Sequence, residues 1–215
     1  MKDILILSGG AYNLKFCSEY LKDKDFSYVI CADRGLDAAD SLGIKPDLIM
    51  GDFDSVNKGV LSKYKKNGAK ILSFPSEKDE SDSELSFMEA VKLKPRSVTV
   101  LGATGKRMDH LLCNINTLNI FLEAGIKAYM VDEYSILSLI KGEEKLYKNK
   151  LFGRYISFIP FTDVVRNVTL TGFKYNVSSF DMYRATSRGL SNEMMEEEAC
   201  ISFDEGIMMM LISRD

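Results

Sequence analysis

The sequence has little of what marks a secreted, membrane-bound or disulfide-linked protein. It contains four scattered cysteines, Cys17, Cys31, Cys113 and Cys200, and no two of them form a C-x-x-C pair. We therefore expect buried, reduced thiols in a cytoplasmic protein. The apolar run at residues 4–7 is too short for a signal peptide, and no apolar run approaches the length of a membrane span, so we expect no membrane partner.

Positive charge is not in excess either. The chain carries 28 Lys and Arg residues against 31 Asp and Glu residues, for a net charge of -3. Nucleic-acid binding normally needs a basic surface, so we expect no nucleic-acid partner. What remains is ordinary for a globular protein, with 46% hydrophobic and 27% charged residues. The 215 residues are enough for one large domain or two modest ones.

The first part of the chain alternates between short apolar strands and helical segments. Strands are expected at residues 4–7, 28–32, 48–50, 69–74, 98–101 and 127–131. Helices are expected between them, with their apolar positions at Leu14, Cys17 and Leu21; at Leu85, Met88 and Val91; and, in one long helix that Gly125 ends, at Leu111, Leu112, Ile115, Leu118 and Leu122. This rhythm predicts an α/β domain at residues 1–133, with a mostly parallel sheet flanked by helices.

After residue 133 the pattern changes. Strands are expected at 135–140, 155–161, 164–170, 199–203 and 207–213, separated by turn signals such as Thr171-Gly172 and Glu205-Gly206. No strong helical pattern interrupts them. Residues 134–215 are therefore predicted to form a small antiparallel β domain, with Met208-Met209-Met210 in its core.

The stretch Pro46-Asp47-Leu48-Ile49-Met50-Gly51-Asp52-Phe53-Asp54-Ser55 carries two aspartates directly after a buried strand. Asp52 and Asp54, one residue apart, can converge on one hard cation, and Mg²⁺ prefers carboxylate oxygens, waters and substrate phosphates. The same residue types also make solvated turns. The motif gains weight because other polar loops follow the neighbouring strands.

Those loops contain Asp33, the acids of residues 79–82 and the segment 102–109. Ligands of parallel sheets bind at the carboxyl ends of the strands, so these loops are expected to meet at one edge of one sheet. Asp82 is a third candidate metal ligand, whereas Ser81, Ser83 and Glu84 suit a helix start.

Two glycine-containing turns belong to the same edge. Ser8-Gly9-Gly10 is expected to open a helix, where it either receives a phosphate on backbone N–H groups or makes a plain tight turn. Gly102 and Gly105 permit close backbone approach to a nucleotide.

The residues that follow Gly105 supply positive charge. Arg107 is a candidate phosphate clamp, because its planar fork matches phosphate oxygens, and Lys106 either assists it or is only a solvated residue. Asp109 could hold Arg107 or orient a substrate hydroxyl. His110, the one histidine, either bonds to backbone at a helix start or has a functional role.

These motifs together resemble the thiamine pyrophosphokinase (thiamine diphosphokinase) family. The matching motifs, in the family's order, are Ala32-Asp33-Arg34-Gly35, Pro46-Asp47 with Gly51-Asp52-Phe53-Asp54-Ser55, Lys78-Asp79-Glu80-Ser81-Asp82, Gly102-Ala103-Thr104-Gly105-Lys106-Arg107-Met108-Asp109-His110 and Gly189-Leu190-Ser191-Asn192-Glu193. The sequence departs from the family at Arg34 and Lys106, where glycine is usual, and at Ser81, where threonine is usual.

The resemblance implies a C-terminal β-sandwich, a homodimer with shared active sites, and Mg²⁺-dependent transfer of a pyrophosphoryl group from ATP to thiamine. It implies catalytic roles for Asp52, Asp54, Asp82, Arg107 and Asp109, with the first three binding metal. It implies ATP binding by Asp33, Arg34, Gly35, Asp79, Gly102, Thr104, Gly105, Lys106, Arg107 and His110, and thiamine binding by Asp82, Asp109, Ser191 and Asn192.

Two other functions stay open at this point. A D-x-D sequence after an apolar strand also marks an aspartyl phosphotransferase or phosphatase, although there the motif usually follows the first strand. A non-catalytic nucleotide-binding module is the other alternative, but carboxylates crowded together without a task cost stability.

Overall fold

The computed structural model describes residues 2–105 and 107–215. The chain divides into two compact units, Met1–Glu133 and Tyr134–Asp215. In the described part of the chain, no helix has the length and apolarity that crossing a membrane requires.

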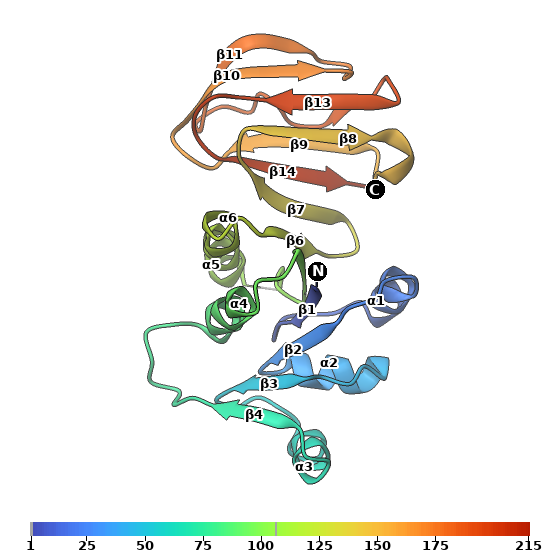
Figure 1. The fold of residues 1–215 in the computed structure, drawn as a ribbon, viewed down its shortest axis with the longest axis vertical. Coiled ribbons are helices and arrows are strands. Elements are labelled where there is room, and N and C mark those ends of the chain that lie inside the picture. Colours follow the sequence, from blue (N-terminus) through green and yellow to red (C-terminus); the bar gives the residue numbers. More distant parts are fainter. Residues whose placement is uncertain (1, 106) are drawn as a thin grey trace. The chain divides into compact units, whose positions relative to one another are not determined.

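The first unit is built on six parallel strands (Figure 1). They are β1 (Asp3–Leu7), β2 (Tyr28–Ala32), β3 (Leu48–Gly51), β4 (Lys70–Ser73), β5 (Ser97–Leu101) and β6 (Lys127–Val131), and their order is β6-β5-β1-β2-β3-β4. The predicted parallel sheet is confirmed. β1 and β3 read as continuous apolar runs because both faces of these strands are buried.

Helices cover both faces of this sheet (Figure 1), with α1, α2 and α3 on one side and α4, α5 and α6 on the other. Their bounds are α1 (Leu14–Leu21), α2 (Gly35–Leu42), α3 (Lys58–Lys66), α4 (Asp82–Lys92), α5 (Met108–Thr117) and α6 (Asn119–Glu123). Side-chain oxygens of Asn13, Asn57 and Ser81 accept hydrogen bonds from the first-turn N–H groups of α1, α3 and α4. These caps explain where the three helices begin.

The predicted buried face of α4 is wrong. Met88 is 41% exposed, whereas Phe87 and Ala90 are fully buried. The Phe87 ring packs on Phe121 of α6, with 5.1 Å between ring centroids. The large aromatic side chain therefore determines which face of α4 packs inward, and Leu85 and Val91 are only half-buried.

The single long helix predicted after residue 110 is two helices. The Thr117 hydroxyl bonds to the carbonyls of Cys113 and Asn114, and such bonds compete with the helical ladder and bend helices. The helix is interrupted at Leu118, which is buried between α5 and α6. Leu112, which was predicted to face inward, is 57% exposed. Gly125, at φ +70°, follows α6 as predicted.

The second unit contains two antiparallel sheets, ordered β12-β9-β14-β7 and β11-β10-β13-β8. The strands are β7 (Ser135–Ile140), β8 (Glu143–Tyr147), β9 (Tyr155–Pro160), β10 (Val164–Thr171), β11 (Val177–Tyr183), β12 (Asn192–Glu193), β13 (Glu198–Ser202) and β14 (Met208–Ser213). Phe158 and Met208 from one sheet share a core with Val165 and Ile201 from the other. The C-terminal β-sandwich is confirmed. Of the three methionines predicted in its core, Met208 and Met210 are buried and Met209 is half-buried.

The sequence did not predict β8, β11 and β12. β8 reads Glu-Glu-Lys-Leu-Tyr with one buried residue, and β12 has only two residues.

The cysteine thiols are free, but Cys113 is exposed, which contradicts the prediction that all four are buried. Burial raises the pKa of Cys17 to about 11, so this thiol stays protonated.

Candidate active site

The loop after β3 holds Asp52 and Asp54 in a fixed arrangement. The backbone N–H of Asp54 donates to Asp52 Oδ1 at 3.0 Å, and the Ser76 hydroxyl donates to Asp54 Oδ2 at 3.0 Å. Phe53 between them has φ +64°, which a bulky residue adopts only where the surroundings impose it. The chain therefore accepts local strain to present both carboxylates at the end of this strand.

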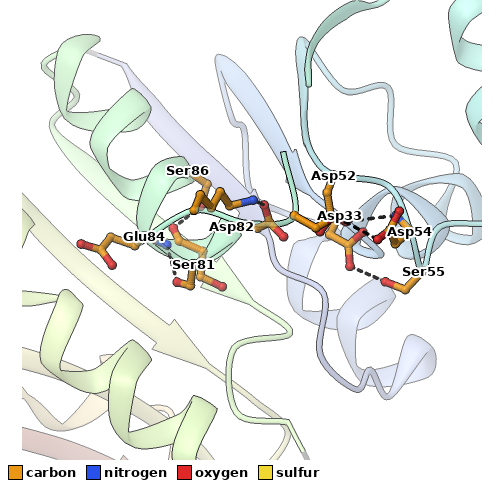
Figure 2. Close-up of polar contacts among 11 residues, drawn as sticks. Asp33, Asp52, Asp54, Ser55, Ser81, Asp82, Glu84 and Ser86 are labelled. Carbon is orange, nitrogen blue, oxygen red and sulfur yellow. Dashed lines mark hydrogen bonds and ion pairs between the residues drawn. The ribbon is translucent and has the colours of Figure 1, made fainter. Parts of the chain in front are cut away.

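Asp33, directly after β2, lies beside this loop (Figure 2). Its N–H donates to the Met50 carbonyl at 2.8 Å, and its Oδ2 accepts from the Ser55 hydroxyl at 2.5 Å. Asp33 Oδ1 is buried and has no hydrogen-bond partner within the described residues. Burial raises the pKa of the Asp33 carboxyl, against the hydrogen bond from Ser55, and the charges of Asp82 and Asp52 add to the rise. The carboxylates of Asp82 and Asp52 thus act electrostatically on that of Asp33.

Asp82 is the first residue of α4, where the Ser81 hydroxyl oxygen caps the helix by accepting from the Glu84 N–H at 3.1 Å (Figure 2). The Lys78 ammonium donates to Asp82 Oδ1 at 2.6 Å. The structure therefore gathers acids from three loops at the carboxyl edge of the sheet, with a lysine bound to one of them. Asp79, from the same segment as Lys78, is exposed.

The Ser8-Gly9-Gly10 turn does not open a helix as expected. α1 begins at Leu14 under the Asn13 cap, and the Gly10 N–H donates to the Gly102 carbonyl at 2.9 Å. Because this N–H already donates to a backbone carbonyl, it is not free to bind a phosphate. The structure therefore supports the alternative of a tight turn.

Tyr12, which sequence reasoning missed, holds this turn against the 102–109 loop. Its hydroxyl donates to the carbonyls of Ser8 at 2.5 Å and Leu101 at 3.2 Å. Burial raises the pKa of Tyr12 well above its usual range, so the phenol keeps its proton. A Cβ added to Gly102 would lie 2.2 Å from the Tyr12 ring, whereas one added to Gly105 would meet nothing closer than 3.9 Å. Position 102 must therefore be glycine, because any side chain there would clash with the Tyr12 ring, whereas there is space beside Gly105.

Arg107 and Asp109 form a two-pronged ion pair at the start of α5. Arg107 Nε donates to Asp109 Oδ1 at 3.1 Å and Nη2 donates to Oδ2 at 2.5 Å. The pair lowers the pKa of Asp109 to about 2, with the Arg107 hydrogen bonds as the main cause. Both side chains remain exposed, at 70% and 63%. The backbone N–H of His110 also bonds to Asp109 Oδ1, while Lys106 lies outside the described residues.

The other residues expected at the nucleotide differ in setting. Arg34 is exposed just before α2, and Thr104 is half-buried. Gly35 packs directly on β1, because a Cβ there would lie 1.9 Å from the Leu7 carbonyl oxygen. Packing alone therefore explains the glycine at position 35.

In the second unit, Ser191 and Asn192 differ in exposure and in hydrogen bonding. Ser191 is exposed at φ +52°, and its N–H donates to the Ser157 hydroxyl at 3.0 Å. Asn192 is 2% exposed; its Oδ1 accepts from the N–H groups of Tyr175 and Glu193, and its Nδ2 donates to the Tyr175 carbonyl at 2.8 Å. Asn192 thereby fixes the backbone of Tyr175, whose ring is exposed.

The acids at the sheet edge fit a hard cation by donor type. No group of three or more His, Cys, Asp or Glu side chains stands ready to hold a metal ion in residues 2–105 and 107–215. Mg²⁺ usually takes one or two carboxylates together with waters and substrate phosphates, so a complete protein cage is not needed. The buried, unpartnered Asp33 Oδ1 is an acceptor that such a site could use.

Comparisons with known proteins agree across both units. Two family models match, "Thiamin pyrophosphokinase, catalytic domain" over residues 19–130 and "Thiamin pyrophosphokinase, vitamin B1 binding domain" over residues 142–208. The thiamine pyrophosphokinase of Bacillus subtilis is 32% identical, with all of both chains covered. The crystal structure of the Bacillus subtilis protein superposes with a TM-score of 0.90 over all of both chains, at 31% identity. That of a thiamin pyrophosphokinase from Geobacillus thermodenitrificans has a TM-score of 0.86, 29% identity and coverage of 99% and 98%.

Proposed function

Because the chain belongs to the thiamine pyrophosphokinase family, we propose that it transfers a pyrophosphoryl group from ATP to the hydroxyl of thiamine, giving thiamine diphosphate and AMP. The observation that carries this proposal is the match of both units, in order, to the catalytic and vitamin B1 binding models. The acids gathered at the carboxyl edge of the first unit support it, because that edge is where parallel sheets bind nucleotides.

Asp52, Asp54 and Asp82 would hold Mg²⁺ at this edge. When bound, the metal neutralises phosphate charge and stabilises the charge that develops during transfer. The hydrogen bonds from the Asp54 N–H and the Ser76 hydroxyl orient the first two carboxylates before substrate arrives. This preorganisation lowers the cost of reaching the reactive arrangement.

Arg107 would bind phosphate oxygens of ATP. Asp109 occupies Nε and one terminal nitrogen of the guanidinium, which leaves Nη1 and the outer N–H of Nη2 to donate to phosphate. Asp109 thus positions the cation, and it remains ionised because the ion pair lowers its pKa to about 2. We assign ATP binding to Asp33, Arg34, Gly35, Asp79, Gly102, Thr104, Gly105, Lys106, Arg107 and His110.

Thiamine would bind against Ser191 and Asn192 of one chain and Asp82 and Asp109 of its partner, in a homodimer with shared sites. Exposed hydrophobic side chains flank both candidate surfaces: Met108 and Leu112 beside Asp109, and Tyr175, Leu190 and Met195 around Ser191 and Asn192. Apolar side chains exposed next to polar site residues suit an interface between copies. We place the enzyme in the cytoplasm, which accords with its free thiols.

Incubation with ATP, Mg²⁺ and thiamine tests the reaction. The expected products are AMP and thiamine diphosphate in equal amounts. Inorganic phosphate with a phosphorylated aspartate would instead support an aspartyl phosphotransferase. Nucleotide binding without any turnover would support a binding module, and either result would overturn the proposal.

A further inference from the structure

Lys78 is less exposed than four other lysines that form ion pairs. Its side chain is only 12% exposed, whereas those of Lys63, Lys92, Lys145 and Lys174 are 46–66% exposed. Its ammonium lies 2.6 Å from Asp82 Oδ1 and 5.7 Å from the centre of the Phe74 ring. Lysine is rarely buried to this extent without a partner that needs its charge.

The need for that charge is visible in the acids around it. Asp82 and Asp52 both act electrostatically on the half-buried Asp33, whose buried Oδ1 has no donor among the described residues. Asp54 adds a further carboxylate from the same loop as Asp52. Like charges close together make each carboxylate harder to keep ionised, and the cation that the structure pairs with one of these acids is Lys78, at Asp82.

An ammonium and a divalent cation that bind one carboxylate share its single negative charge and repel each other. Asp82 Oδ1 accepts from Lys78 in the structure, and the same carboxylate is a proposed ligand of Mg²⁺. Asp82 is the first residue of a helix that Ser81 caps, so its backbone is held in place. One carboxylate in a fixed position would therefore have to serve both cations.

We propose that Lys78 is a built-in counter-cation, which holds Asp82 while the site is free of metal and competes with the divalent cation for it. This inference rests on the proposed function of the acid cluster. Lys78 thereby stabilises the metal-free protein and weakens metal binding until substrate phosphates contribute their own oxygens. It is a positioning residue that acts through Asp82.

The test is metal binding without substrate. Lys78→Met keeps the apolar stem of the side chain and removes the charge, and Lys78→Gln removes the charge but keeps a hydrogen-bond donor. Titration calorimetry with Mn²⁺, without nucleotide, should show binding tighter by roughly 10-fold in both variants, because a positive charge next to a ligand oxygen is gone. The melting temperature of the metal-free variants should fall and should recover on adding Mg²⁺.

Lys92→Met is the matched control, since Lys92 pairs with Glu89 on the same helix and is exposed. It should leave Mn²⁺ affinity unchanged. Unchanged or weaker Mn²⁺ binding in both Lys78 variants would overturn the proposal and leave Lys78 a packing residue. If the wild-type protein binds no Mn²⁺, or if Asp54→Asn leaves its binding unaltered, the metal assignment itself fails together with this inference.

Discussion

Single carboxylates of the candidate site are held in different ways, and the differences set what each substitution should do. Asp54 accepts from one side-chain hydroxyl and its N–H bonds to Asp52, so its charge is not consumed by an ion pair in the described residues. Asp82 is bound by Lys78, and Asp109 by Arg107. Asp52 and Asp54 form no ion pair among the described residues, so their negative charge is available to bind a metal ion.

Asp54→Asn should therefore abolish most turnover while the protein stays folded. The amide keeps the size and can still accept from Ser76, but the lost charge should cost on the order of 100-fold or more in kcat. Steady-state AMP formation measures this. Asp40→Asn, which breaks an ion pair with Lys63 on another surface, is the control and should keep near-normal kcat. Near-normal kcat in Asp52→Asn and Asp54→Asn alike would end the metal assignment.

Arg107→Lys should be poorly tolerated, because an ammonium cannot make the two-pronged contact with Asp109 and also reach phosphate. We expect binding of a non-hydrolysable ATP analogue to weaken roughly 10-fold, with little change in melting temperature, since exposed ion pairs stabilise little. Calorimetric titration measures the affinity. Arg96→Lys, at the similar pair with Asp3, should leave it unchanged. Intact affinity with a lowered melting temperature would make the Arg107 pair purely structural.

At the scale of elements, the loops of the sheet edge are fastened to one another. Tyr12 joins the turn after β1 to the end of β5, and the Gly10 N–H joins it to Gly102. These contacts make the position of the 102–109 loop depend on a residue ninety positions away in the chain.

Tyr12→Phe should expose this dependence. Losing the hydroxyl removes two hydrogen bonds to backbone carbonyls and should cost about 1–2 kcal/mol in the free energy of unfolding. The KM for ATP should rise several-fold, because the loop that carries Arg107 loses its support. Urea denaturation and steady-state kinetics measure the two effects. Tyr64→Phe, whose hydroxyl bonds weakly to the Ile44 carbonyl, is the control. An unchanged KM in a destabilised Tyr12→Phe would limit Tyr12 to stability.

At the scale of the whole molecule, each unit has its own core, and the proposed site draws on two chains. A shared site can be tested by mixing two inactive variants, Asp54→Asn in the first unit and Ser191→Asn in the second. Asparagine suits the left-handed backbone of Ser191 and extends into the space proposed for thiamine. Ser191 is the better target because Asn192 is buried and bonded to backbone.

Random pairing makes half of the dimers mixed, and each mixed dimer has one intact site, so about a quarter of wild-type activity should return. Thiamine diphosphate formation after subunit exchange measures it, with each variant alone as the baseline. Activity that stays at this baseline, although exchange is demonstrated by a labelled subunit, would rule out sites shared between chains.

The sequence alone determined the order and type of most elements, and it placed the acids after the strands of the first unit, because both depend on local signals. Apolar runs predicted β1 to β6, and polar residues at the carboxyl ends of parallel strands must meet whatever the details of packing. The assignment of thiamine as substrate came from the resemblance to a family, because composition and hydrophobic periodicity do not identify a substrate. β8 and β11, each with one buried residue, and the two-residue β12 lacked such a signal and were missed.

Only the tertiary structure decided which side chains are paired. The burial of Phe87 against Phe121 set the face of α4, and Tyr12 determined that Gly102 must lack a side chain. The Lys78–Asp82 pair and the use of Asn192 on the Tyr175 backbone likewise depend on distances that spacing does not encode. Burial and partner choice arise from contacts between segments distant in sequence, so they were fixed only once the chain had folded.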